Sequence, residues 1–213
     1  MDNKTITDTQ ISYDRLADEY VRRIYGELQH KPLDRQLLED FANRLEDAGL
    51  VADIGCGPGH VTRYLREHGV EVCGIDLSSE LVERARRLNP GIDFRQGNLF
   101  SLDLGDGALV GVISFYSIIH VPALDHVLAF SEFRRVLRQG GLLLVSFHLG
   151  EQGVHFDELW GQDVTLDFHF FCTDQVADAL RSAGFEVEKT TERDPYPEIE
   201  AQTRRGYLLA RAV

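Results

Sequence analysis

The sequence predicts an α/β fold: one doubly wound sheet of seven strands, mostly parallel, with an antiparallel C-terminal hairpin strand and N-terminal helices. Three observations carry this prediction. From Leu50 onward, short apolar runs alternate with amphipathic segments, which is typical of βα units around a parallel sheet. A glycine-rich turn at 55–59 separates the first apolar run from a helical segment. The last two apolar runs have no helical segment between them and therefore favour antiparallel pairing.

The N-terminal part predicts two helices. The first covers residues 12–28 and places apolar and aromatic side chains at helical spacing, namely Tyr13, Leu16, Ala17, Tyr20 and Ile24. This stripe fits either core packing or a mobile flap whose tyrosines close over a site. The second helix is expected from about Leu33 to Ala48, with Gly49 as its stop. We treat residues 1–48 as a helical lid.

The seven expected strands cover residues 50–54, 70–75, 92–96, 109–115, 142–147, 185–190 and 207–210. Helices are expected over 61–67, 80–88, 124–137 and 173–183. The fifth run is apolar throughout, as in a strand buried on both faces. Residues 191–205 are expected to form the loop of the terminal hairpin, and 148–172 an irregular insertion. The length of 213 residues fits a single domain over residues 1–213.

Composition excludes several classes of protein. A formal net charge of −13 disfavours nucleic acid and anionic membranes as partners. Cysteines at 56, 73 and 172 form no CxxC pair and are odd in number, so neither a zinc ribbon nor a disulfide framework is expected. No secretory signal begins at Met1, and no apolar stretch reaches the ~18 residues of a membrane span. We therefore expect a cytoplasmic protein, monomeric or homodimeric.

Polar residues follow four of the expected strands. In an open doubly wound sheet, ligands bind off the carboxyl ends of the strands, and the first βα loop receives a nucleotide-like group. Asp53 ends the first strand beside the glycine loop, Asp76 ends the second, Asn98 follows the third, and Ser117 and His120 follow the fourth. We therefore expect these side chains to meet in one ligand site.

The glycine loop holds Gly55, Gly57 and Gly59, whose missing Cβ atoms allow a ligand to approach the backbone. A turn that is glycine-rich for packing alone is the alternative. Asp76 lies 21 residues after Gly55, and a carboxylate at the end of a second strand can accept both ribose hydroxyls. Asp76-Leu77-Ser78-Ser79 also fits a simple helix cap.

From about residue 12 to its end, the chain resembles the class I S-adenosylmethionine-dependent methyltransferases of the small-molecule type. The resemblance rests on Asp53–Gly59, Gly74–Ser78, Gly97–Leu99, Tyr116–His120, Gly140-Gly141, the terminal hairpin and Tyr13-Asp14-x-x-Ala17-x-x-Tyr20. It implies a Rossmann-like fold, S-adenosylmethionine as cofactor and S-adenosylhomocysteine as product.

Site roles follow from this resemblance. The glycine loop with Cys56 holds the methionyl end, Asp53 supports the loop or the cofactor's ammonium group, and Asp76 takes the ribose hydroxyls. Further cofactor contacts are implied for Tyr13, Tyr20, Leu77, Leu99 and Ser117.

Two positions depart from the family pattern. Asn98 stands where the family usually has Asp facing the adenine amino group, and an amide oxygen still accepts a hydrogen bond from that group. Val110 replaces an acidic residue that often precedes the fourth strand.

Two other functions fit parts of the pattern. A nicotinamide-dependent Rossmann oxidoreductase shares the loop and the second-strand acid, but GxGxxG fails because His60 occupies the third glycine position. A methyltransferase-like binding protein without activity is the other alternative, against which the intact loop and an available base argue.

Methyl transfer to an oxygen or nitrogen acceptor needs in-line alignment and removal of a proton. His120 is the candidate general base, and Tyr13 or Tyr20 is expected to orient it or share its proton. A packing role for His120 is the alternative.

The insertion at 148–172 is expected to cap the substrate, walling an aromatic pocket through His148, His155, Trp160, Phe168, His169, Phe170 and Phe171, although ordinary packing explains several of these equally well. His148, His155, Asp157 and His169 lack tight ligand spacing, so no metal site is predicted. Thr203-Arg204-Arg205 fits a solvated face or a carboxylate contact.

Overall fold

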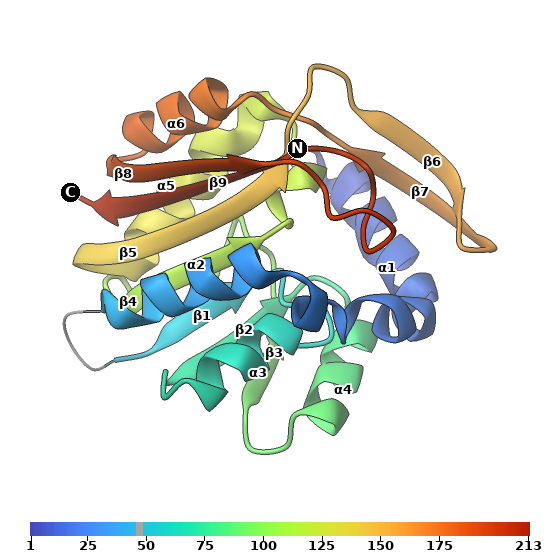
Figure 1. Cartoon of the computed structure of the whole chain (residues 1–213), viewed down its shortest axis with the longest axis horizontal. Coiled ribbons are helices and arrows are strands. Elements are labelled where there is room, and N and C mark those ends of the chain that lie inside the picture. The colour runs from blue at the N-terminus through green and yellow to red at the C-terminus, as the bar shows by residue number, and fades with distance from the viewer. Residues whose placement is uncertain (46–48) are drawn as a thin grey trace.

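The computed structural model describes residues 1–45 and 49–213 and has at its centre a seven-stranded sheet. Its strands are β1 (Val51–Ile54), β2 (Val72–Asp76), β3 (Asp93–Gln96), β4 (Leu109–Phe115), β5 (Leu137–His148), β8 (Phe185–Arg193) and β9 (Arg205–Ala212). They lie in the order β3-β2-β1-β4-β5-β9-β8 (Figure 1). The first five are parallel, and β9 runs antiparallel between β5 and β8. The predicted sheet and its terminal hairpin are confirmed.

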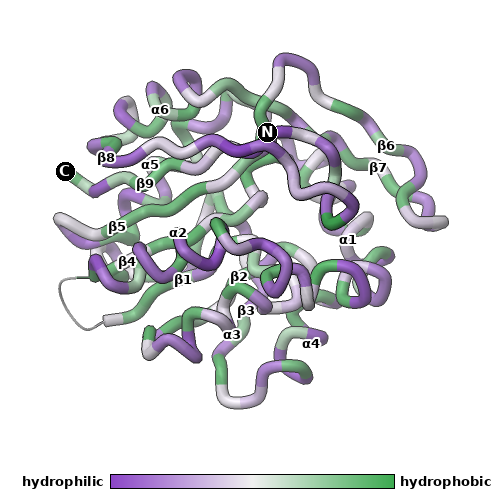
Figure 2. Tube along the Cα trace, in the orientation of Figure 1, coloured by the Kyte–Doolittle hydropathy of each residue, from purple (hydrophilic) through white to green (hydrophobic). Residues whose placement is uncertain are grey.

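The helices are α1 (Asn3–Ile24), α2 (Pro32–Asn43), α3 (His60–Glu67), α4 (Ser79–Leu88), α5 (His126–Val136) and α6 (Thr173–Ser182), with short 3-10 turns η1 (Glu27–His30), η2 (Ile118–His120) and η3 (Ala123–Asp125). Side chains alternate across the central strands. Val51 packs toward α2 and α3, whereas Ala52 packs toward α5 and α6. Figure 2 shows the apolar central strands between more hydrophilic helices. No helix in the described part of the chain has both the length and the apolar character to cross a membrane.

The bounds of the first two helices differ from the prediction. The first helix ends at Ile24 instead of residue 28, and the separate turn η1 follows it. α1 begins at Asn3 instead of residue 12, because the Asp2 side chain accepts a hydrogen bond from the Thr5 N–H and caps the helix. α2 ends at Asn43. The second helix was predicted to continue to Ala48, but residues 44 and 45 are not helical, so this part of the prediction is wrong. The last three predicted residues, 46–48, lie outside the described residues.

The segment 148–172 is not irregular, contrary to expectation. It contains a hairpin of β6 (Val154–Leu159) and β7 (Gln162–Phe168), which turns at Trp160 and Gly161 with φ values of 54° and 78°. Positive φ at both turn residues matches the twist of a two-residue hairpin. Leu166 packs against Leu16 of α1, so this hairpin braces the N-terminal helix.

Three more boundaries move by a few residues. β5 begins at Leu137, so the preceding helix ends at Val136. The terminal strands extend to Arg193 and back to Arg205, which shortens their connecting loop to 194–204. Pairing with neighbouring strands determines where these strands begin and end, because the local sequence does not specify their terminal residues.

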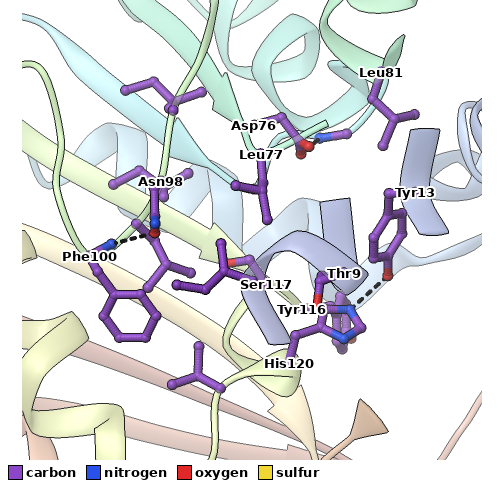
Figure 3. A pocket seen from close by; sticks show the side chains of 18 of the residues that line it. Thr9, Tyr13, Asp76, Leu77, Leu81, Asn98, Phe100, Tyr116, Ser117 and His120 are labelled. Carbon is purple, nitrogen blue, oxygen red and sulfur yellow. Dashed lines mark hydrogen bonds between the residues drawn. The ribbon is translucent and has the colours of Figure 1, made fainter. Parts of the chain in front are cut away.

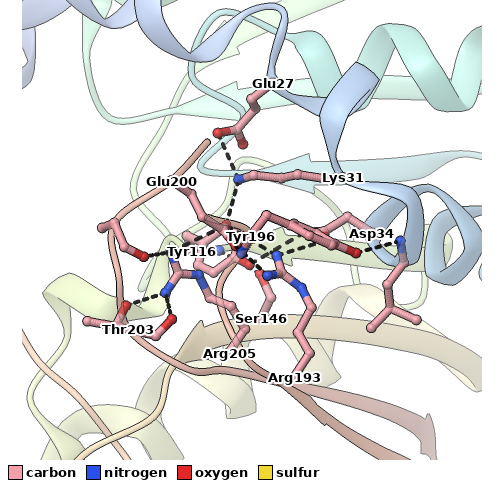
Figure 4. A network of polar contacts seen from close by, with 12 residues as sticks. Glu27, Lys31, Asp34, Tyr116, Ser146, Arg193, Tyr196, Glu200, Thr203 and Arg205 are labelled. Atoms are coloured by element: carbon pink, nitrogen blue, oxygen red, sulfur yellow. Dashed lines mark hydrogen bonds and ion pairs between the residues drawn. The ribbon is translucent and has the colours of Figure 1, made fainter. Parts of the chain in front are cut away.

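A buried ion network joins α2 to the terminal hairpin (Figure 4). Arg193 donates to Asp34 at 2.9 Å and also pairs with Glu200. Lys31 and Arg205 reach the same Glu200 carboxylate at 3.3 and 3.4 Å. Two interpretations were open for Thr203-Arg204-Arg205, a solvated face or a carboxylate contact. Arg205, which is only 2% exposed, makes a carboxylate contact.

Arg204 is half exposed and pairs with Glu192 at 3.0 Å. It lies on the solvated face that was expected for the whole run.

Replacing Asp34 with Ala is expected to lower the free energy of unfolding by about 3 kcal/mol, because Arg193 loses a buried partner. The matched control is Asp40→Ala, which also links α2 to β8 but through an exposed pair with Lys189 at 3.2 Å. That change should cost no more than about 0.5 kcal/mol. Urea denaturation of both variants measures the difference, and equal losses would contradict a role for burial.

Candidate functional site

A cavity lies at the carboxyl edge of β1, β2 and β4, where the strand order reverses (Figure 3). It holds about 740 Å³ of empty space, including its part open to solvent. Small-molecule and cofactor pockets lie at this position in doubly wound sheets. Predicted site residues in its wall are Tyr13, Tyr20, Gly55, Gly57, Asp76, Leu77, Asn98, Leu99, Ser117 and His120.

The glycine loop forms the wall beyond β1. Gly55 and Gly57 have φ values of 79° and 52°, which glycine adopts without strain. A Cβ atom on Gly55 would lie 2.2 Å from the Ser117 Cβ, and one on Gly57 would lie 3.3 Å from the Tyr20 ring. Glycine is therefore required both for the turn and for the close approach of its neighbours.

Cys56 and Gly59 do not line the cavity. The buried Cys56 side chain packs with Phe94 and Val82 under α4. A Cβ atom on Gly59 would meet Phe94 and Asn89 instead of the cavity. These two residues shape the loop from behind.

Asp76 connects the glycine loop to the segment after β2. Its Oδ2 accepts a hydrogen bond from the Gly57 N–H at 2.7 Å, and its Oδ1 accepts one from the Ser78 N–H at 2.9 Å. Burial raises the pKa of Asp76 to about 6, while these N–H groups favour the ionised form. The carboxylate faces the cavity between the two loops.

Asp53 lies behind the loop. Its Oδ2 accepts from the Thr62 hydroxyl at 2.6 Å, and the residue is 1% exposed. Burial raises the pKa of this carboxyl to about 6. Of the two expected roles, this contact fits support of the loop, since Asp53 ties the end of β1 to α3.

Apolar residues gather at the opposite end of the cavity, around Asn98. Leu99 and Phe100 line this end, whereas Leu77 lines the cavity next to Asp76. The Asn98 amide oxygen already accepts a hydrogen bond from the Phe100 N–H at 3.0 Å. An incoming amino group would therefore share that oxygen with the backbone.

Tyr13 and His120 form a hydrogen-bonded pair on the α1 side. Tyr13 Oη lies 2.7 Å from His120 Nε2, and His120 Nδ1 lies 2.9 Å from the Asp167 carbonyl oxygen. A carbonyl only accepts, so Nδ1 carries the proton and Nε2 accepts from the Tyr13 hydroxyl. Burial lowers the pKa of His120 to about 4 and raises that of Tyr13. The pair is therefore neutral at pH 7. Tyr20 stacks edge-on against Tyr13.

The hairpin insertion surrounds this pair without lining the cavity in the part of the chain that the structure describes. Phe168 lies against His120, with ring centroids 4.8 Å apart, and Trp160 lies 6.0 Å from Tyr20. His155 is exposed and bonds Asp167 and Asp157.

The other aromatic residues of the expected cap lie elsewhere. His148 bonds Thr203, Phe170 stacks on His148, and His169 and Phe171 belong to a ring cluster beside His126. The expectation that these residues wall the cavity is therefore wrong for this structure. Among the described residues, no group of three His, Cys, Asp or Glu side chains is arranged to hold a metal ion.

The predicted site residues do not include several residues of the wall: Met1, Ile6, Thr9, Ile54, Ile75, Leu81, Gly97, Phe100, Phe115, Tyr116 and Val121. Ile6 and Thr9 lie in the first turns of α1, and Met1 directly precedes this helix, in a stretch that the sequence prediction places before the first helix. Asp2 as a helix cap, followed by Ile6, Thr9 and Tyr13 at helical spacing, is the signal that could have found them.

Comparison with known proteins agrees with this architecture. Residues 52–145 match the family described as "Methyltransferase domain". A probable S-adenosylmethionine-dependent methyltransferase of Mycolicibacterium smegmatis is 32% identical over 170 residues, covering 78% of this chain and 58% of that protein. N-demethylindolmycin N-methyltransferase of Streptomyces griseus is 29% identical over 194 residues, covering 78% of this chain and 81% of that protein.

A solved structure has the same fold. It is 1,6-didemethyltoxoflavin-N1-methyltransferase of Burkholderia thailandensis with bound 1,6-didemethyltoxoflavin and S-adenosylhomocysteine, with a TM-score of 0.70 at 18% identity, covering 99% of this chain and 88% of that one. This chain spans about half the length of the first curated relatives that it matches, with shares of 58%, 50% and 39%.

The sheet order, the glycine loop and the acid after β2 define a Rossmann-like domain with a cofactor cavity at its switch point. The matched domain and the similar proteins support a class I S-adenosylmethionine-dependent methyltransferase. They therefore support S-adenosylmethionine as the cofactor in place of a nicotinamide.

Affinity for S-adenosylhomocysteine is expected to fall as the pH drops from about 8 to about 5. The ionised Asp76 carboxylate accepts hydrogen bonds, and it is lost as the pH falls through its pKa of about 6. Calorimetric titrations across this range measure the trend, with Asp76→Asn as the control that should bind weakly and with a flatter pH profile. A wild-type affinity that is constant down to pH 5 would contradict the role of the carboxylate.

Proposed function

We propose that this chain transfers a methyl group from S-adenosylmethionine to an oxygen or nitrogen atom of a small-molecule acceptor. The observation that carries this proposal is the neutral Tyr13–His120 pair in the wall of the same cavity as Asp76 and Gly57. The two N-methyltransferases among the similar proteins support a small-molecule acceptor. The acceptor itself is left open, because fold and cofactor do not determine it.

The residues present fit the cofactor. Gly55 and Gly57 line the cavity and would present their backbone to the methionyl end, and Asp76 lines the same cavity, where it would accept from the ribose hydroxyls. Leu77 and Leu99 offer apolar surface to the adenine, and Asn98 offers its amide. When bound, S-adenosylmethionine supplies an electrophilic methyl group on a sulfonium.

Tyr13 and His120 handle the proton of the acceptor. The Tyr13 oxygen keeps a free lone pair because its hydrogen points to His120 Nε2. As the acceptor atom gains the methyl group and the methyl–sulfur bond breaks to leave S-adenosylhomocysteine, Tyr13 would take the acceptor's proton and pass its own proton to His120 Nε2. The Asp167 carbonyl then stabilises the imidazolium through Nδ1–H. Burial lowers the pKa of His120 to about 4, so release of this proton from the imidazolium is favourable at pH 7.

Wild-type protein is expected to bind S-adenosylmethionine and S-adenosylhomocysteine, and Asp76→Ala should weaken binding at least about tenfold because a charged acceptor is lost. Isothermal titration calorimetry measures both. No heat of binding with the folded wild type would refute the proposed function. Binding without turnover, in a screen of hydroxyl and amine acceptors, would favour a binding protein that lacks activity.

His120→Ala is expected to lower kcat by about a hundredfold while the cofactor Kd stays unchanged, because only the proton step loses its acceptor. Tyr13→Phe should act in the same direction. S-adenosylhomocysteine formation with the acceptor from the screen gives the rates. The control is His68→Ala, on the surface at the end of α3, which should retain full activity. A His120→Ala rate equal to that of wild type would remove His120 from the mechanism.

A further inference from the structure

α1 forms one wall of the cavity along much of its length. Ile6, Thr9, Tyr13 and Tyr20 of this helix all line it. Figure 3 shows Thr9 and Tyr13 of α1 beside His120, across the cavity from Asn98. Tyr20 also lies against Gly57 of the glycine loop. A ligand bound beside Asp76 and the glycine loop would therefore lie against α1.

One side chain of α1 is bonded to the segment that follows Asp76. The Asp14 Oδ1 atom accepts hydrogen bonds from the Ser78 hydroxyl at 2.6 Å and from the Glu80 N–H at 3.1 Å. Ser78 is completely buried, and its own N–H donates to Asp76 at 2.9 Å. A single residue thus connects α1 to the carboxylate at the centre of the cavity.

Asp14 also completes the first turn of α4. The Ser78 hydroxyl oxygen accepts a hydrogen bond from the Leu81 N–H at 3.1 Å, and the Asp14 carboxylate accepts one from the Glu80 N–H. Free N–H groups at a helix N-terminus favour a negative charge, so the Asp14 carboxylate stabilises this turn. When α1 moves away, both the Ser78 hydroxyl and the Glu80 N–H lose this acceptor.

A closed ring of contacts results. Asp14 bonds Ser78, Ser78 bonds Asp76, Asp76 bonds Gly57, and Gly57 lies against Tyr20, which is again on α1. The same Asp76 carboxylate therefore faces the cavity and belongs to the ring that holds the helix closed.

We propose that Asp14 is a positioning residue that couples closure of α1 to the occupied cofactor cavity by holding Ser78 beside Asp76. This inference rests on the proposed function, because the occupant of the cavity is the cofactor. Asp14 does not line the cavity and acts through Ser78.

Two other polar contacts of α1 involve neither Ser78 nor Asp76. Asp18 pairs with Arg84 of α4 at 3.0 Å, but its side chain is 81% exposed. Ser12 bonds the backbone of Thr165 and fastens α1 to the hairpin. Asp18 therefore provides a matched control: it is an aspartate on the same helix that also reaches α4 but does not contact Ser78.

The test compares Asp14→Ala, Asp14→Asn and Asp18→Ala. Asp14→Ala is expected to raise the Kd for S-adenosylhomocysteine roughly tenfold, mainly through faster dissociation, because a charged acceptor of two hydrogen bonds is lost. Asp14→Asn keeps an oxygen acceptor and should stay within about threefold of wild type. Asp18→Ala should match wild type. Calorimetry gives Kd, and stopped-flow displacement gives the dissociation rate.

Hydrogen exchange on the wild type tests the same coupling without a variant. S-adenosylhomocysteine is expected to slow exchange at the Glu80 amide and at the α1 amides around Asp14 together. In Asp14→Ala, the bound ligand should protect α1 less. Thermal unfolding of each ligand-free variant separates this effect from general destabilisation, because a purely structural role lowers the unfolding temperature without changing the dissociation rate.

The outcomes are distinguishable. Two results would overturn this inference while leaving the proposed function intact, provided that the wild type binds S-adenosylhomocysteine. One is a dissociation rate that is unchanged in Asp14→Ala, and the other is a dissociation rate that changes equally in Asp18→Ala. The inference is also overturned if the ligand slows hydrogen exchange at the Glu80 amide of the wild type without slowing it at the α1 amides around Asp14. A folded wild type that does not bind S-adenosylhomocysteine overturns the proposed function and this inference together.

Discussion

The Asp76 carboxylate accepts two backbone hydrogen bonds at once. One comes from the Gly57 N–H in the loop after β1, and the other from the Ser78 N–H in the segment after β2. These are the two loops that a ligand at the switch point must contact, and this one side chain sets their spacing. Burial disfavours its charge, and the two N–H donors offset that cost. The shape of the cavity therefore depends on a charged group that is also the natural acceptor for ribose hydroxyls.

The hairpin of β6 and β7 affects the chemistry from outside the cavity. Its Asp167 carbonyl receives the Nδ1–H of His120, which directs the free Nε2 lone pair toward Tyr13. Leu166 of the same hairpin packs on Leu16 of α1. An element outside the cavity wall thus determines both the tautomer of the histidine and the position of the helix that carries its tyrosine partner.

The buried ion network supports the wall on the other side. Tyr116 lines the cavity with a φ of 56°, a conformation that costs a non-glycine residue of order 1–3 kcal/mol. Its hydroxyl meets that of Tyr207 at 2.9 Å, and Tyr207 donates to Asp34 at 3.0 Å. The Tyr116 N–H donates to the Ser146 hydroxyl oxygen at 3.0 Å. These bonds hold the strained residue in place and connect the cavity wall to the Arg193 and Glu200 ion pairs.

Hydrophobic periodicity and glycine spacing were enough to determine the alternation of strands and helices, the antiparallel terminal hairpin and the cavity residues at the ends of β1 to β4. These signals are local, because a strand end and a turn are written in a few consecutive residues. The ends of the expected strands indicated Asp76 and His120 as candidates, and the family resemblance supplied Tyr13 or Tyr20 as the partner of His120. It also included Cys56 and Gly59, whose neighbours Phe94 and Asn89 come from distant parts of the chain.

Only the tertiary structure decided which side chains face the cavity and which support it from behind. Asp53 and Asp76 both end buried strands, yet the first bonds Thr62 of α3 and the second lines the cavity. The contacts Asp14–Ser78, His120–Asp167 and Arg193–Asp34 join residues 64, 47 and 159 positions apart. Such pairs have no local pattern. They form because folding brings separate elements to one edge of the sheet, where each buried polar group must find a partner.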